Sequence, residues 1–154
     1  MRIACAFDHA GVSLREVVME TLAAAGHEVL DLGTDDAGSG DDYPDRALDV
    51  GRALGAGEAE RGVLCCGSGA GVAVAASKLD GVRAAMAHDT YTAHQCVEHD
   101  DVNVLALGAR VIGPEIAADL VRAFAAAEFS GEERHVRRLA KVAAIERDGI
   151  NAEL

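Results

Sequence analysis

The sequence predicts an α/β fold: a three-layer, Rossmann-like sandwich in which helices cover both faces of a five-stranded parallel sheet. Five short apolar runs alternate with segments whose apolar residues recur at helical spacing. The connections between them are short, which is typical of β-α-β units with parallel strands. Half of the residues are hydrophobic but only 3% are aromatic, as expected for thin helices that pack closely on a sheet.

The predicted strands are apolar runs that end in polar or glycine residues. They cover residues 2–7, 27–32, 63–66, 82–87 and 102–107. Because the carboxyl ends of parallel strands lie at one edge of a sheet, we expect the polar residues of these junctions to line one cleft there. These residues are Asp8 and His9, Tyr43, Cys66 to Ser68, His88 and Asp89, His99 and Asp100, and Arg110.

The predicted helices follow from apolar spacing and from residues that start or stop a helix. Leu14, Val18 and Leu22 repeat at helical spacing, and Gly26 then ends that helix. Pro44 is tolerated in the first turn of the next helix. The predicted helices cover residues 12–25, 44–57, the segment from the glycine turn to Lys78, 90–99, 115–126 and an extra C-terminal helix at about 132–147.

Length and charge limit the domain count and the partners. The 154 residues suffice for one domain with a sizeable core and are too few for two ordinary domains. The formal net charge of −12 argues against nucleic acids and anionic membranes as partners, so an anionic small substrate would need a local basic site. Because the sequence has no signal-peptide pattern and no apolar run of about 20 residues, we expect a cytoplasmic protein.

The third strand ends in a turn with glycine at positions 67, 69 and 71. Glycines let the chain approach a bound anion closely, and the following helix adds partial positive charge, so the turn is a candidate anion cradle. Cys66 is the last strand residue beside these N–H groups. The helix end is expected to favour its thiolate, so Cys66 could carry a proton in catalysis, with Ser68 as a hydrogen-bond donor.

Competing motifs fit poorly. A dinucleotide fingerprint starting at Gly67 would need glycine or alanine at position 72, which is Val72, and no Gly-Lys-Ser/Thr of a phosphate-binding loop is present. Ser68 lacks the G-x-S-x-G context of a nucleophile. Neither the four cysteines nor the histidines show zinc-ligand spacing, so we expect no metal. The adjacent Cys65 and Cys66 should face opposite sides of the sheet.

The C-terminal helix carries a basic stripe in an otherwise acidic chain. The stripe consists of Arg134, Arg137, Arg138 and Lys141 at helical spacing, and the opposite face carries Val136, Leu139 and Ala143. Such a helix is either an ordinary solvated face, which composition alone favours, or an arm that reaches a neighbouring subunit.

Several motifs, in order along the chain, resemble the ribose-5-phosphate isomerase B family, which also includes galactose-6-phosphate isomerase subunits. The resemblance extends to about Glu146, and its specificity comes from six motifs in register rather than from any one of them. The motifs are Asp8-His9-Ala10-Gly11, Asp42-Tyr43-Pro44, Cys66 to Gly71, Glu98-His99, Asn103 to Arg110, and Arg134-His135-Val136-Arg137-Arg138.

This resemblance implies a cofactor-free aldose–ketose isomerase that converts D-ribose 5-phosphate to D-ribulose 5-phosphate through a cis-enediolate. Cys66 would be the base, Ser68 a donor or acid at the substrate oxygens, and His99 the group that opens the furanose ring. The turn residues Gly67, Gly69, Ala70 and Gly71 would stabilise the oxyanion. The remaining implied contacts are Asp8 and His9 with sugar or phosphate, Tyr43 lining the cleft, and Arg110, Arg134 and Arg138 clamping phosphate. Arg134, His135 and Arg138 would come from the second subunit of a homodimer, alone or within a dimer of dimers.

Asp100 departs from the family pattern, which usually has asparagine there as a donor to the substrate. An ionised carboxylate cannot donate and would repel a developing enediolate. The alternatives are therefore an isomerase of another tetrose, pentose or hexose phosphate and, from other classes, a non-catalytic phosphosugar- or nucleotide-binding module or a structural homo-oligomer with a vestigial site.

Overall fold

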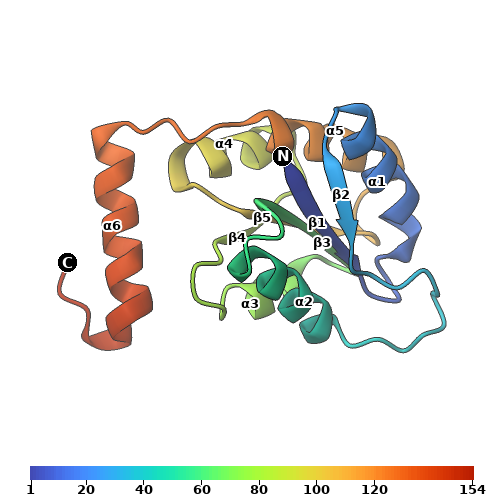
Figure 1. The fold of residues 1–154 in the computed structure, drawn as a ribbon, viewed down its shortest axis with the longest axis horizontal. Helices are drawn as coiled ribbons and strands as arrows, with labels where there is room; N and C mark the ends of the chain where they lie inside the picture. The colour runs from blue at the N-terminus through green and yellow to red at the C-terminus, as the bar shows by residue number, and fades with distance from the viewer.

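A five-stranded sheet, parallel throughout, forms the centre of the computed structural model, which describes residues 1–154 (Figure 1). The spatial order is β2-β1-β3-β5-β4, so the chain reverses its direction of growth between β1 and β3. The predicted fold class is confirmed, although β2 and β4 are shorter than the apolar runs that predicted them. The strands are β1 (Arg2–Phe7), β2 (Glu28–Asp31), β3 (Arg61–Cys66), β4 (Ala84–Met86) and β5 (Val104–Gly108).

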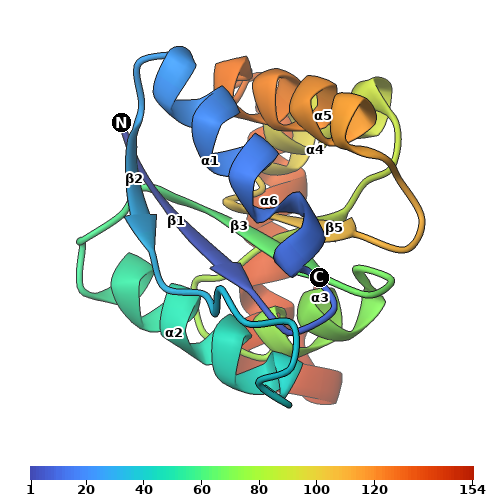
Figure 2. The same ribbon diagram turned by 90° about the vertical axis from the view of Figure 1, so that its right-hand side faces the viewer.

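Helices cover both faces of the sheet. Figure 2 shows α2 (Tyr43–Gly55) and α3 (Ala70–Ala76) on one face. The other face carries α1 (Arg15–Ala24), α4 (Thr90–Asp100) and α5 (Pro114–Ala126). The first predicted helix is divided, since a 3-10 turn, η1 (Val12–Leu14), precedes α1. None of the helices combines the length and the apolar character needed to cross a membrane.

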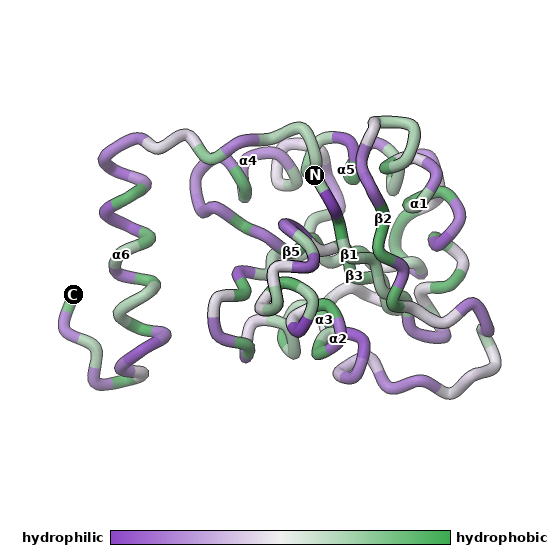
Figure 3. The backbone as a smooth tube through the Cα atoms, in the orientation of Figure 1, coloured by the Kyte–Doolittle hydropathy of each residue, from purple (hydrophilic) through white to green (hydrophobic).

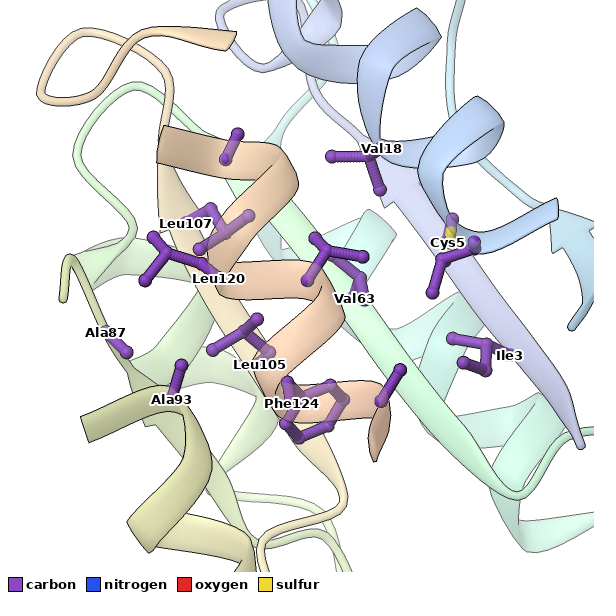
Figure 4. Packing of buried hydrophobic residues seen from close by; sticks show 14 of the residues in the cluster. Ile3, Cys5, Val18, Val63, Ala87, Ala93, Leu105, Leu107, Leu120 and Phe124 are labelled. Carbon is purple, nitrogen blue, oxygen red and sulfur yellow. The ribbon is translucent and has the colours of Figure 1, made fainter. Parts of the chain in front are cut away.

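The sheet separates two hydrophobic cores. The core under α1, α4 and α5 holds the large side chains, and Figure 4 shows Leu120 and Phe124 of α5 against Leu105 of β5. The core under α2 and α3 is built mainly from alanine and valine. Cys65 belongs to the first core and Cys66 to the second, which confirms that they face opposite sides of the sheet.

The C-terminal helix α6 (Glu133–Asp148) stands beside the sandwich and ends in the 3-10 turn η2 (Gly149–Asn151) (Figure 1). Two hydrogen bonds hold it near the sandwich: Ser130 N–H donates to the Glu98 carbonyl (3.0 Å), and Gly81 N–H donates to Glu146 Oε1 (2.9 Å). Apolar and polar residues alternate along α6 in Figure 3. Its residues Val136, Val142 and Ile145 are each about half exposed, at 48–49%.

Candidate active site

The loops after β1, β3 and β5 meet at the carboxyl edge of the sheet, where the order of the strands reverses. Backbone hydrogen bonds join them directly: Asp8 N–H donates to the Cys65 carbonyl (3.2 Å) and Ala109 N–H to the Cys66 carbonyl (2.9 Å). Arg110 N–H donates to the Gly67 carbonyl (2.9 Å). A crevice at such a reversal is where open α/β sheets bind ligands. The structure thus brings together this part of the predicted site.

The thiol of Cys66 lies at the base of the glycine turn. Its Sγ accepts the N–H of Gly69 (3.1 Å), and Gly69 has a φ of 83°, a conformation that favours glycine. No hydrogen-bond acceptor within the chain is found for the backbone N–H groups of Gly67, Ser68 and Gly71. Three free donors therefore lie beside one sulfur, as an oxyanion-binding turn requires.

The adjacent Cys65 has a different environment. Its side chain is fully buried in the core under α1 and α5, and this burial raises the pKa of its thiol well above the ordinary value. Cys65 is thus held as a neutral core residue. Cys66, 5% exposed, is the cysteine at the turn.

Ser68, Tyr43 and Arg110 surround the turn. Ser68 is exposed, and its Oγ accepts the N–H of Ala70 (3.3 Å). A Cβ added at Gly71 would lie 3.1 Å from the ring of Tyr43, so the tyrosine packs directly on the turn. A Cβ added at Gly67 would lie 3.5 Å from Cδ of Arg110, which places this side chain over the first glycine.

Asp8 and His9 follow β1 and complete this edge. Asp8 is 4% exposed, and its Oδ1 accepts the N–H groups of Ala10 (2.9 Å) and Gly11 (2.8 Å). One carboxylate oxygen is thus occupied in shaping the turn, a structural role that the sequence did not reveal. His9 Nδ1 lies 3.1 Å from the Asp41 carbonyl. Because a carbonyl only accepts, Nδ1 is the donor and Nε2 of the neutral ring is an acceptor.

His88 is a supporting residue whose role sequence reasoning missed. Its Nε2 accepts the N–H of Gly108 (3.1 Å) at the end of β5. A Cβ added at Gly108 would lie 2.5 Å from the Ser68 carbonyl oxygen, so β5 ends in direct contact with the glycine turn. His88 therefore fixes the strand on which the turn rests; its position after the fourth predicted strand was the only signal for it.

The prediction that His99 and Asp100 lie in the same cleft as Cys66 is wrong within one chain. Both lie at the end of α4, which runs back to the start of β5. The next residue, Asp101, accepts Nε of Arg83 (2.7 Å) just before β4, at the amino-terminal edge of the sheet. The five residues of β5, at about 3.3 Å each, separate the two edges by roughly 15 Å.

His135 is also placed differently from its prediction as a substrate contact. Its side chain is 1% exposed and stacks on His99, with ring centroids 4.2 Å apart and an interplanar angle of 30°. Its Nδ1 lies 2.6 Å from Oγ of Ser130. Burial, and next the neighbouring His99, lower the pKa of His135. In this structure His135 lies behind His99 and does not face an open cleft.

Arg134 and Arg138 are exposed on α6, and both lie close enough to His135 to contribute to the lowering of its pKa. Arg134 Nε pairs with Glu132 Oε2 (2.9 Å). No group of three or more His, Cys, Asp or Glu side chains is arranged to hold a metal ion. The predicted site residues therefore form two groups, one at each edge of the sheet: Asp8, His9, Tyr43, Cys66 to Gly71 and Arg110 at the carboxyl edge, and His99, Asp100, Arg134, His135 and Arg138 at the amino-terminal edge.

Comparison with known proteins identifies one family. Residues 3–142 match the family model described as Ribose/Galactose Isomerase. Ribose-5-phosphate isomerase B of Escherichia coli is 39% identical over 145 residues, which are 94% of this chain and 96% of the relative. D-erythrulose-4-phosphate isomerase of Pectobacterium atrosepticum is 40% identical over 131 residues, covering 85% of this chain and 86% of the relative.

A solved structure shares the fold over nearly the whole length. The ribose-5-phosphate isomerase B of Clostridium thermocellum superimposes with a TM-score of 0.91 at 42% identity, covering 96% of this chain and 99% of that one. The similarity therefore includes the sheet and both helix layers.

Proposed function

Because the chain belongs to the ribose/galactose isomerase family, we propose that this sugar phosphate isomerase interconverts D-ribose 5-phosphate and D-ribulose 5-phosphate. The observation that carries the proposal is the Cys66 sulfur, held by the N–H of Gly69 beside the free donors of the glycine turn. A thiol is not needed merely to bind a phosphosugar, whereas an isomerase needs a group that moves a proton between two carbons.

The proposed chemistry starts from the open-chain aldose. Cys66 removes the proton from C2, the released electron pair forms the C1–C2 double bond, and O1 becomes the oxyanion of a cis-enediolate. The N–H groups of Gly67, Ser68 and Gly71 stabilise this charge. The Cys66 thiol then returns the proton to C1, while the Ser68 hydroxyl relays the O2 proton to O1. No cofactor takes part in this scheme, since no electrons leave the sugar.

The phosphate needs cations, and one chain places only Arg110 over the turn. We therefore propose a homodimer in which the end of α4 and the helix α6 of one subunit lie over the carboxyl edge of the other. His99 would then open the furanose ring, and Arg134 and Arg138 would bind the phosphate together with Arg110. In this arrangement residues 1–154 form one domain with an exchanged C-terminal helix.

Exposed apolar side chains support this arrangement. Val136, Val142 and Ile145 lie half exposed on α6, and near the carboxyl edge Met86 is 44% and Val111 57% exposed. Two apolar surfaces that stay in water in one chain would cover each other in the dimer.

D-erythrulose 4-phosphate is the second candidate substrate, because one relative at 40% identity bears the name of that activity. Asp100 is the residue of this chain that supports this second candidate. A carboxylate only accepts hydrogen bonds, so in the proposed dimer Asp100 would bind other substrate groups near the reacting carbons than an asparagine does. The chemistry at Cys66 would be the same for either sugar.

The test is an isomerase assay on four-, five- and six-carbon aldose and ketose phosphates with a chelator present. We expect turnover of ribose 5-phosphate well above the other sugars. Preference for a tetrose phosphate would keep the mechanism and replace the substrate. Absence of turnover on every sugar, with phosphosugar binding retained, would contradict the proposal in favour of a binding module.

A further inference from the structure

Three side chains connect the segment before α6 to the end of α4. Ser130 Oγ lies 2.6 Å from His135 Nδ1, and the His135 ring stacks on His99 at 4.2 Å. The backbone N–H of Ser130 donates to the carbonyl of Glu98, the residue before His99 (3.0 Å). These contacts fix the linker, the first turn of α6 and the last turn of α4 to one another around His99.

The hydrogen bonds of Ser130 determine how His135 is held. Glu132 N–H donates to Ser130 Oγ (3.3 Å), and the same Oγ shares a hydrogen bond with His135 Nδ1. This bond fixes the orientation of the buried ring, whichever of the two atoms carries the shared proton.

The stack brings no second positive charge onto His99. Two imidazolium rings at a centroid distance of 4.2 Å would repel each other, and burial lowers the pKa of His135, which favours the neutral form of its ring. The charged or titratable groups around the pair are His94, Glu98 and Asp100 from α4, Glu132 from the linker, and Arg134 and Arg138 from α6. Glu98 Oε2 lies 3.8 Å from His99 Nε2.

The unpaired Nε2 atom of His135 indicates that this side chain does more than fill space in the interior. Its Nε2 is buried and has no hydrogen-bond partner, which is costly for a polar group. A phenyl ring would fill the same space and stack on His99 without that cost. The presence of a polar ring, hydrogen-bonded to Ser130, therefore indicates that His135 positions His99.

We propose that Ser130 and His135 are positioning residues for His99, and that the stacked pair joins His99 to α6, so that the ring-opening group and the phosphate-binding arginines are presented as one unit. This inference rests on the proposed function and specifies how its ring-opening step is supported. In that step the C1–O4 bond breaks and its electron pair takes a proton from His99. The O1–H electrons form the C1 carbonyl, and the O1 proton passes to water.

The test compares a sugar that forms a ring with one that cannot. Ribose 5-phosphate closes a furanose through O4, and 4-deoxyribose 5-phosphate, of the same length, has no O4 and stays open. For Ser130→Ala and His135→Ala we expect kcat on ribose 5-phosphate to fall roughly tenfold or more, since small misplacements of a catalytic group are costly. On the 4-deoxy sugar we expect kcat to stay within about twofold of the unmodified enzyme.

Ser130→Thr keeps the hydroxyl and should retain both activities, which makes it the matched control; melting temperature and subunit state are compared for all variants. Equal losses on both sugars, or no loss on ribose 5-phosphate in either variant, would overturn the positioning role. If the unmodified enzyme turns over neither sugar, the proposed function itself fails, which is a distinguishable result.

Discussion

Both edges of the sheet carry polar residues of the predicted site, but different kinds of contact hold them in place at the two edges. At the carboxyl edge, Cys66 and its turn are fixed by backbone hydrogen bonds from Ala109 and Arg110 and by a side chain packed on Gly71. At the amino-terminal edge, His99 lies at the end of a helix and Arg134 on a helix that stands beside the sandwich. There the order comes from side-chain contacts such as the stack of His99 on His135.

This difference indicates a division of labour. A base that moves a proton between adjacent carbons must be held in one place, and a strand end in the middle of a parallel sheet provides that. Groups that bind a phosphate act at the periphery of the sugar and tolerate delivery on a helix. We therefore expect substitutions at the carboxyl edge to lower kcat and substitutions of the arginines on α6 to raise KM. His135, also on α6, acts through His99 and is the exception, since its substitution should lower kcat.

The largest effect is expected for Cys66→Ala. Loss of the proposed base should lower kcat roughly 10²–10⁴-fold on every substrate, with little change in phosphosugar affinity, because proton transfer at carbon is common to all of them. Steady-state kinetics and isothermal titration with ribose 5-phosphate measure the two quantities. Unchanged turnover would remove Cys66 from the role of base.

Cys65→Ala is the matched control for that substitution. The residue is adjacent in sequence but buried in the opposite core, so it should retain turnover and lose only about 1 kcal/mol of stability from a small cavity. A loss of kcat comparable to that of Cys66→Ala would show that the two faces of the strand are not functionally distinct.

Arg134→Ala should have an intermediate effect of a different kind. One hydrogen-bonded cation on a phosphate is worth about 1.5–3 kcal/mol, so KM should rise roughly 10–100-fold while kcat changes little. Arg137→Ala, on the same helix but outside the proposed clamp, should leave KM near its original value. An effect of Arg134→Ala confined to kcat would break the proposed division between the edges.

The smallest effect is expected for Asp100→Asn. In the proposed dimer, an amide at position 100 would supply a donor and remove a negative charge near the enediolate, so kcat/KM for ribose 5-phosphate should rise by about threefold to tenfold, as for one neutral hydrogen bond. The ratio of kcat/KM for ribose 5-phosphate and D-erythrulose 4-phosphate measures whether residue 100 sets the choice of sugar. No change in that ratio would mean that Asp100 turns away from the substrate.

Most of the fold could be predicted because its signals are local. The glycine after α1, the proline that begins α2 and the apolar runs of the strands determine the elements regardless of what packs on them. The boundaries of β2 and β4 were less predictable, since pairing partners rather than composition determine how far an outer strand extends.

The site could be predicted only in part. Residues after strands were correctly gathered at one edge, but His99 ends a helix, and a helix that connects parallel strands returns the chain to the opposite edge. That geometric signal was present in the sequence. The burial of His135 was not, because it depends on how α6 packs against α4, and these two helices lie far apart in the sequence.

Mixing two inactive variants tests the shared site most directly. Cys66→Ala and His99→Asn are unfolded together, refolded as a mixture and assayed on ribose 5-phosphate. If each site takes Cys66 from one subunit and His99 from the other, half of the dimers are mixed and have one intact site of two. Activity should then return to roughly a quarter of the unmodified level, as the symmetry of a dimer requires. Cys66→Ala mixed with Arg110→Ala, two changes in the same half of the site, should restore nothing. Failure of the first mixture to regain activity, although mixed dimers form, would contradict a site built from two chains.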